Sequence, residues 1–322
     1  MNSLLARFAE NSFWMARYIE RAENLARIID VNETFARDER GSNDWLPILR
    51  LHCDEERYFE RYREADATGV VRFYIIDRNN EHSIVCCVRG ARENARSIRH
   101  LVSLETWTQL NVFYNWVSAL NARSLNFAQL SRLCAQIKEA CQLHSGIVTG
   151  TLYRDQVFSF YRLGVFIELC DQVTRLVDIK YHALLPNRKD VGSPFDVAQW
   201  NALLRSAAAY HGYRRVYPRG MTPTTVAGFI LLDPHFPRSI PHCVRYIEEN
   251  LGGLLARDEL AHVVFSTENL DRLKALAQRA PEQVVAGGLH EFIDDVQLAL
   301  LALGAQISDT FFAAKLPAAA AS

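Results

Sequence analysis

The sequence lacks the features that mark several classes of protein. Its 322 residues contain no Cys-x-x-Cys pair, and the seven cysteines, an odd number, are scattered through apolar or helical contexts. This pattern argues against a structural zinc site or a disulfide framework and favours buried free thiols in a reducing compartment. A phosphate-binding glycine loop is also missing, because Gly252-Gly253 and Gly287-Gly288 have neither the spacing nor the lysine of such a loop.

Excess charge and long apolar runs are missing as well. The formal net charge is -1, so nothing draws the whole chain toward nucleic acid or an anionic membrane. The longest apolar stretch, Val296 to Ile307, is shorter than the ~20 residues that span a bilayer. Residues 1–7 have no charged start followed by an apolar run, so no signal peptide is expected. We therefore expect a cytoplasmic protein.

Most of the sequence has the hydrophobic periodicity of α-helices. Only residues 70–76 have strand-like composition, and they lie between helical neighbours without a partner strand, so a helix is predicted there, with a small hairpin as the alternative. The sequence predicts an all-α multi-helix bundle, built either as one unit or as two packed helical halves with weak internal duplication. We expect one domain over 1–316, with possible halves 1–150 and 151–316, and a disordered tail at 317–322.

Prolines and capping residues set the expected helix boundaries. Loops are predicted at 186–193 and 211–223, and a turn at 233–239, after which Ser239 caps a helix. The expected helices are 13–31, 44–51, 54–65, 70–76, 83–100, 106–123, 127–150, 151–185, 194–210, 224–232, 239–251, 267–278 and 281–312.

The first long helix carries the most informative pattern. At about 100° per residue, its apolar side chains cover roughly half the circumference, so it should be well embedded. The opposite stripe carries charges of both signs at helical spacing and comprises Arg17, Glu20, Asn24 and Arg27, flanked by Arg21.

A later segment partly repeats this helix. Residues 167–179 are similar in sequence to residues 19–31: Glu168 aligns with Glu20, and Arg175 aligns with Arg27. Gln172 and Asp178 likewise match Asn24 and Asp30, whereas Val165 and Leu169 replace Arg17 and Arg21. The match indicates either internal duplication or a chance likeness of two amphipathic helices.

Four arginines share one face of the helix expected at 83–100. They are Arg89, Arg92, Arg96 and Arg99. Guanidinium groups so placed repel one another unless anions face them. The row therefore either pairs with glutamates of a neighbouring helix or forms a pocket for carboxylate or phosphate.

Residues 13–23, Phe-Trp-Met-Ala-Arg-Tyr-Ile-Glu-Arg-Ala-Glu, resemble the signature of the bacterial alpha-E family, an all-helical domain named for its Glu-Arg motif. The resemblance covers nearly the whole chain and includes 92–96, 106–111, 162–178 and 236–239. Genes of this family commonly neighbour those of a circularly permuted ATP-grasp ligase and a transglutaminase-like peptidase. The resemblance thus implies an auxiliary role in ATP-dependent amide or peptide-bond formation. ATP and Mg are then expected on the partner ligase, with no cofactor in this chain.

The second motif departs from the family pattern. It usually reads Gly-Arg-Tyr-Leu-Glu-Arg-Ala, whereas residues 164–170 here are Gly-Val-Phe-Ile-Glu-Leu-Cys, without either arginine. Either this member has lost one half of a paired polar site, or the second motif is mainly structural.

The sequence gives weaker indications of metal binding, nucleophilic catalysis and nucleic-acid binding. Glu259-x-x-His262 fits a single di-iron motif, but no second Glu-x-x-His is present, so no metal site is expected. Cys141 and His144 are one turn apart on an ordinary amphipathic helix and do not indicate a nucleophile. Aromatic and basic residues alternate over 213–219, as in single-strand binders, yet the overall charge argues against nucleic acid.

These features lead to one hypothesis and two alternatives. The chain is expected to work with an ATP-grasp ligase, and possibly a transglutaminase-like protein or a second copy of itself, through a polar cleft that joins the two arginine-bearing helices. The cleft would bind an acidic or peptide-like ligand or the ligase, with Glu20 orienting arginines or acting as an acid or base. The alternatives are a free-standing enzyme that uses Glu20 and a scaffold without ligand. The expected site residues are Arg17, Glu20, Arg21, Asn24, Arg27, Arg89, Arg92, Arg96, Arg99, Glu168 and Arg175.

Overall fold

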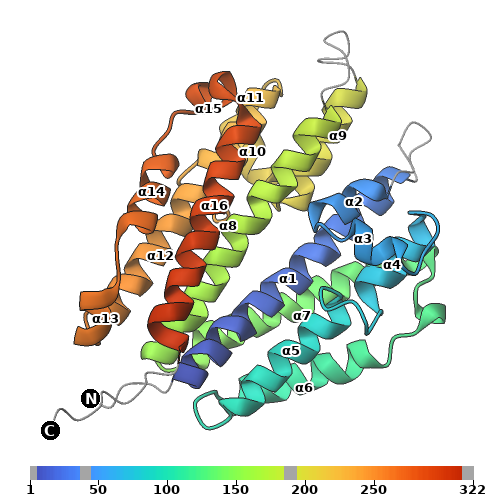
Figure 1. Cartoon of the computed structure of the whole chain (residues 1–322). Helices are drawn as coiled ribbons and strands as arrows, with labels where there is room; N and C mark the ends of the chain where they lie inside the picture. Colours follow the sequence, from blue (N-terminus) through green and yellow to red (C-terminus); the bar gives the residue numbers. More distant parts are fainter. Residues whose placement is uncertain (1–5, 37–44, 185–193, 314–322) are drawn as a thin grey trace, which may run out of the picture.

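A computed structural model describes residues 6–36, 45–184 and 194–313 of the chain. These residues form helices and connecting turns, with no strand among them (Figure 1). The prediction of an all-α multi-helix bundle is confirmed, and residues 70–76 lie mainly in a helix rather than a hairpin. Within the described ranges, every helix is too short or too polar to span a bilayer. The predicted tail at 317–322 lies outside the described residues.

The first half of the chain forms a four-helix arrangement. α1 (Ala6–Ala36) packs against α5 (Ile84–Ser97) and α7 (Leu130–Thr151), and α6 (Leu104–Ser118) contacts both of these. Short helices connect the long ones: α2 (Leu46–Leu51), α3 (Glu55–Phe59), α4 (Ala67–Ile75), η1 (Ala122–Ser124) and η2 (Phe127–Gln129).

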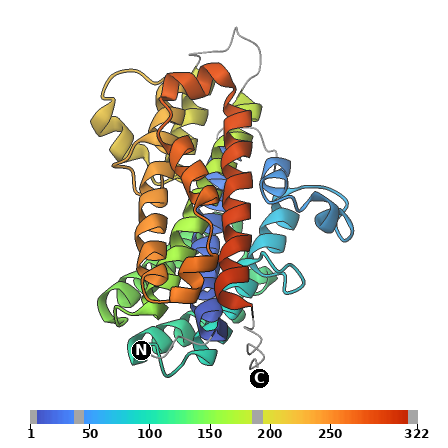
Figure 2. The same ribbon diagram turned by 60° about the vertical axis from the view of Figure 1, so that its left-hand side comes forward.

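The second half repeats this order (Figure 2). α8 (Gln156–Leu184) packs against α12 (Ile240–Leu255) and α16 (Leu289–Ile307), and α14 (Glu268–Ala277) contacts both of these. The shorter elements are α9 (Pro194–Ser206), α10 (Tyr210–Val216), α11 (Pro223–Leu232), α13 (Glu259–Val264), α15 (Pro281–Gly287) and a π-helical turn, η3 (Ser308–Phe312).

The turns that lead into α5 and α12 match atom by atom. Asp77 Oδ1 accepts a hydrogen bond from the backbone two residues on, and Ser83 caps α5 by accepting from the amide of Cys86. In the second half Asp233 and Ser239 make the equivalent bonds at the start of α12, as predicted for Ser239. Equivalent turns in equivalent places are what an internal duplication would produce.

The two halves meet along α1 and α8, which have the most extensive contact of any helix pair (Figure 1). Gly164 permits this close approach, because a Cβ there would collide with the carbonyl oxygen of Phe13 and lie 3.0 Å from the Ala16 side chain. Ser12 adds a buried hydrogen bond of 2.7 Å from its hydroxyl to the carbonyl of Val157. The central helix pair therefore fixes the register between the halves.

α1 is buried on both of its faces. The apolar face contributes Ile19, Leu25 and Ile29 to the core, as predicted. The charged stripe is not open to solvent, because Glu20 and Glu23 are only 6% and 4% exposed. Buried polar side chains need partners, and those of α1 find them in both halves: Arg17 and Arg21 bond to α8, whereas Asp30 pairs with Lys138 of α7.

Several sequence-based boundaries were wrong. The predicted helix 281–312 breaks at Gly288, whose φ of 102° lies in the left-handed region. Residues 211–216 of the predicted loop 211–223 belong to α10, because Tyr213 is buried and stacks on Tyr217. The helix expected at 54–65 ends at Phe59.

All seven cysteines are free thiols, and six of them are buried. Burial raises the pKa of Cys87 to about 12 and that of Cys134 to about 12, which keeps these thiols protonated and unreactive. Cys53 is the exposed exception.

Candidate ligand-binding site between helices α1, α8 and α16

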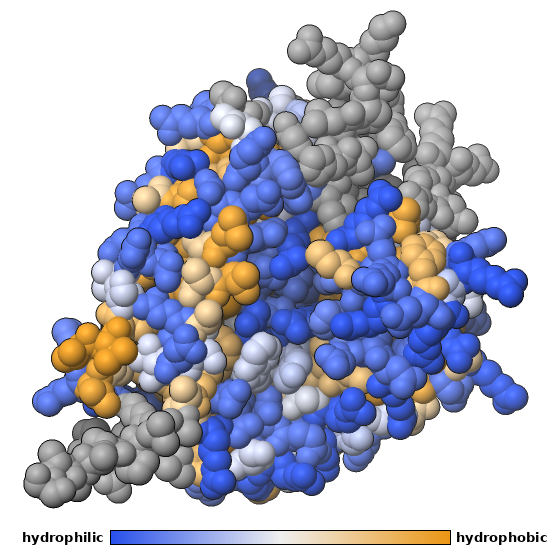
Figure 3. Space-filling model, viewed as in Figure 1, coloured by the Kyte–Doolittle hydropathy of each residue, from blue (hydrophilic) through white to orange (hydrophobic). Residues whose placement is uncertain are grey.

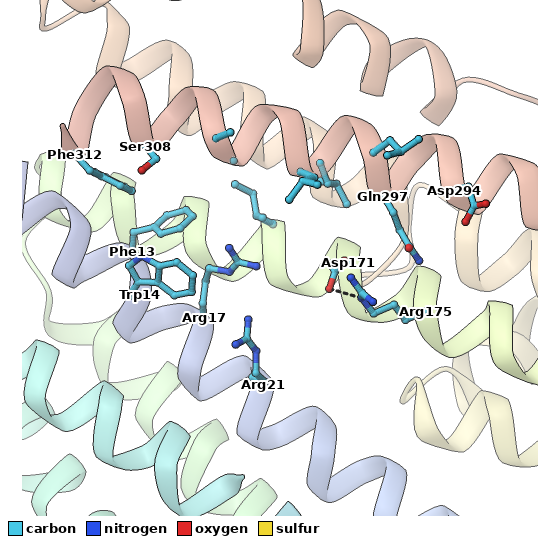
Figure 4. Close-up of a pocket in the computed structure, with 16 residues that line it drawn as sticks. Phe13, Trp14, Arg17, Arg21, Asp171, Arg175, Asp294, Gln297, Ser308 and Phe312 are labelled. Carbon is cyan, nitrogen blue, oxygen red and sulfur yellow. Dashed lines mark hydrogen bonds and ion pairs between the residues drawn. The ribbon is translucent and has the colours of Figure 1, made fainter. Parts of the chain in front are cut away.

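A cavity of about 720 Å³ lies between the two halves of the molecule. Three long helices form it, with α1 and α16 on either side of α8 (Figure 4). Its volume is within the range of small-molecule sites. The lining residues include the guanidinium groups of Arg17, Arg21 and Arg175, the carboxylates of Asp171 and Asp294, and the aromatic rings of Phe13, Trp14 and Phe312.

Two arginines of the first motif share the glutamate of the second motif. Arg17 Nε donates to Glu168 Oε2 at 2.7 Å, and Arg21 donates to both oxygens of Glu168 from Nε at 2.8 Å and Nη2 at 3.0 Å. Glu168 is fully buried and also accepts from Gln172 Nε2 at 3.0 Å. The i, i+4 spacing of Arg17 and Arg21 on α1 brings both to one carboxylate on the facing helix.

This arrangement keeps Glu168 charged. Burial by itself raises the pKa of its carboxyl, but the charges of Arg21 and Arg17 outweigh burial and hold the pKa well below its usual value. Burial likewise opposes the charge of Arg21, and the bond to Glu168 outweighs it and raises the Arg21 pKa. One carboxylate thus faces two guanidinium groups, which leaves one net positive charge at this end of the cavity.

The arginines retain donors for a ligand. A guanidinium group has more N–H donors than the bonds to Glu168 occupy. Arg17 lies over the rings of Trp14 and Phe13, at 4.8 and 5.6 Å from their centroids, which restricts its orientation. Preorganised guanidinium groups with open donors are the usual recognition element for carboxylate or phosphate.

The opposite part of the cavity has a different charge pattern. Arg175 Nε pairs with Asp171 Oδ2 at 2.9 Å, one turn along α8, so these two charges offset each other. Asp294 of α16 lies 3.5 Å from His290 Nε2 and is about half exposed. In the described ranges neither arginine nor lysine pairs with Asp294, so this end of the cavity is negative whenever His290 is neutral.

The wall on α16 is apolar and open. Leu298 and Leu301 line the cavity and are 58% and 73% exposed. In Figure 3, orange side chains lie beside a hollowed hydrophilic centre. Gly304 follows one turn later and leaves space, because a Cβ added there would contact nothing within 4 Å. The cavity therefore combines a polar floor with an apolar rim.

Glu20 has an environment opposite to that of Glu168. It occupies the equivalent place in the first motif, but Val165 and Leu169 stand where the second motif would supply arginines. Its neighbour Glu23 takes the available cations, accepting from Arg27 Nε at 2.9 Å and from Arg238 Nη2 at 3.1 Å. Burial, followed by the charge of Glu23, raises the pKa of Glu20 to about 7.

The structure separates the two predicted arginine sets. Cys87, Ala91 and Ala95 form the buried face of α5, and Gly90 packs on Tyr18 of α1. The arginines of α5 lie on the face of this helix that is turned away from α1. Arg92 donates to Asn111 of α6 at 2.8 Å and lies over Tyr114, while Arg99 lies over Trp107. Arg89 contacts Cys86 within α5, and Arg96 pairs with Glu93 on the surface.

The predicted cleft joining both helices is therefore wrong. The arginines of α1 face α8 across the cavity, and α5 takes no part in the cavity lining. Of the eleven predicted site residues, Arg17, Arg21 and Arg175 line the cavity, and Glu168 lies beneath two of them. Glu20, Asn24 and Arg27 lie outside the cavity lining.

The contribution of α16 to the cavity was not predicted from the sequence. Asp294, Gln297, Leu298 and Leu301 follow helical spacing, and this alternation of polar and apolar residues was the available signal. Arg238 was noted only for family resemblance, although it pairs with the first motif from the turn before α12.

Glu259 and His262 lie on the short helix α13, and the described residues contain no cluster of three or more side chains able to hold a metal ion.

Comparison with known proteins identifies the family. Residues 4–312 match the model of the Alpha-E family, described as a predicted alpha-helical domain with a conserved ER motif. No curated protein and no solved structure matches the chain. The match spans nearly the whole chain and contains both motifs that meet at Glu168. This chain belongs to the Alpha-E family.

Proposed function

We propose that this chain is a ligand-binding component of an ATP-grasp amidoligase system in the cytoplasm. The observation that carries the proposal is the cavity floor, where Arg17 and Arg21 share the single buried carboxylate of Glu168. The surplus positive charge and the open guanidinium donors suit an acidic or peptide-like ligand. The resemblance to the family supports the ligase as the partner, with ATP and Mg bound there.

The cavity favours recognition over catalysis by this chain. Glu20 has the pKa of a useful acid or base, yet it lies outside the cavity lining, so a ligand held by Arg17 and Arg21 would not reach it through this cavity. We therefore assign ligand binding to this chain and bond formation to the ligase. A transglutaminase-like protein could act on the same product.

Filling the cavity tests the proposal. Gly304→Leu places a side chain in the open space without a backbone clash, and Gly253→Leu on α12 is a matched control because its Cβ also meets nothing. The tagged wild-type protein and both variants are purified from the native host. Mass spectrometry then identifies co-purifying proteins and the small molecules released on denaturation.

We expect a carboxylate-bearing molecule from the wild type and from Gly253→Leu, and much less from Gly304→Leu. Equal recovery from all three proteins, or none from the wild type, would contradict the ligand role. The absence of an ATP-grasp protein from the wild-type sample would contradict the partner role.

A further inference from the structure

We infer that the cavity takes a short peptide in extended form, about three residues long, with both termini free. Its carboxylate lies at Arg17 and Arg21, and its ammonium group lies at Asp294. The inference rests on the proposed function and specifies the chemical class of its ligand.

The charges that line the cavity change from positive at one end to negative at the other. The end formed by Arg17, Arg21 and Glu168 has one surplus positive charge, and the Asp171–Arg175 pair, which extends from the middle of the cavity to the level of Asp294, is balanced. Asp294 adds a negative charge at the far end, where Gln297 Oε1 is a further acceptor, since Gln297 uses its amide nitrogen to donate to Thr174. A zwitterion whose charges are well separated complements this order.

The helices fix how far apart the two charged ends are. His290 contacts Asp178 and Gln297 contacts Thr174, so α16 runs antiparallel to α8 and Asp294 lies level with residues 174–178. Glu168 lies about eight residues away along α8, or roughly 12 Å at ~1.5 Å per residue. An extended peptide advances about 3.3–3.6 Å per residue, so about three residues span this separation.

The apolar rim indicates which side chain the middle of the peptide carries. Leu298 and Leu301 of α16 line the cavity between the two charged ends, and Ile167 of α8 lines it beside Glu168. Figure 4 shows Arg17 and Arg21 on one side, Asp294 and Gln297 at the other end, and the α16 wall along the path. An aliphatic side chain in the middle of the peptide would cover this exposed surface. Amino acids are too short to reach both ends.

Three forms of one tripeptide test the inference by isothermal titration calorimetry on the full chain. The probes are Ala-Leu-Ala, its N-acetyl derivative and its C-terminal amide. We expect the free peptide to bind, and each blocked form to bind about tenfold more weakly or worse, because each loses one charge-assisted contact. Asp294→Asn should abolish the preference for the free N-terminus while retaining the preference for the carboxylate.

Asp295→Asn is the matched control. Asp295 is the next residue on α16 but pairs with Arg272 on the surface and does not line the cavity, so this variant should behave like the wild type. Equal affinity for the free and N-acetyl peptides would overturn the ammonium assignment while the carboxylate site stands. Equal affinity for the free peptide and its amide would instead contradict the carboxylate site itself. No binding of the free peptide at millimolar concentration would overturn the peptide assignment, and native purification would still test the proposed function.

Discussion

At the scale of the residue, two glutamates in equivalent motifs have opposite electrostatic environments. Glu168 is held between two arginines, whereas Glu20 lies beside Glu23 with Val165 and Leu169 at the corresponding places. Apolar residues at these two positions of the second motif therefore have a local consequence. They leave one buried carboxyl that titrates near neutrality and one that stays charged.

Glu168→Gln should be strongly destabilising. Removing the charge leaves Arg17 and Arg21 partly buried without a counter-ion, which typically costs about 3–5 kcal/mol. Urea denaturation measures the loss, and Glu248→Gln, which breaks a solvent-exposed pair with Lys274, should change the stability little. Similar losses in the two variants would contradict the assignment of Glu168 as the buried anchor.

Glu20→Gln should instead stabilise the protein above neutral pH. The folded-state pKa of about 7 exceeds the ~4.3 of an unfolded glutamate, so the folded protein binds more protons in this window. Stability therefore falls as pH rises from about 4.3 to about 7, and a neutral glutamine does not incur this loss.

The effect is measured by urea denaturation at pH 5 and pH 8. The variant should be more stable than the wild type by about 3 kcal/mol at pH 8, and by only about 1 kcal/mol at pH 5. Glu60→Gln, on the surface, should show no such difference. A Glu20→Gln variant that is less stable than the wild type at pH 8 would show that the charged carboxylate is required.

At the scale of the element, the central helices show what periodicity can and cannot predict. The pattern of α1 predicted a long helix with an embedded apolar face, and this is confirmed. The same pattern could not reveal that its charged stripe is also buried, because the partner carboxylate is supplied by α8 from far along the chain. Likewise, the helical spacing of four arginines over 89–99 predicted a shared face, but not that α5 ends before Arg99 or that aromatic rings of α6 lie against Arg92 and Arg99.

Gly164→Ala tests the contact between α1 and α8. A Cβ at this position collides with backbone of α1, so the helices must separate, which we expect to cost about 1–3 kcal/mol. Gly146→Ala on α7 is the matched control, since space is open there and alanine favours a helix by about 0.5–1 kcal/mol. Thermal unfolding distinguishes the two, and equal effects would mean that the helices do not rely on this close approach.

At the scale of the whole molecule, the candidate site exists only because two similar halves pack together. α1 supplies the arginines, α8 supplies the anchoring glutamate, and α16 supplies the rim, so neither half contains the site alone. The family and the all-α class could be predicted from sequence. The composition of the cavity could not, because it depends on which faces of distant helices meet.

The central claim is that Arg17 and Arg21 recognise a carboxylate in this cavity. Calorimetric titration of Ala-Leu-Ala and its amide against Arg21→Lys tests it most directly. Lysine keeps the charge beside Glu168 but loses the planar fork. Arg92→Lys, which alters the arginine row of α5, is the control. We predict that Arg21→Lys loses about tenfold in affinity for the carboxylate form and most of its preference over the amide, with Arg92→Lys unchanged. An unchanged preference in Arg21→Lys, or its loss in Arg92→Lys, would contradict the account.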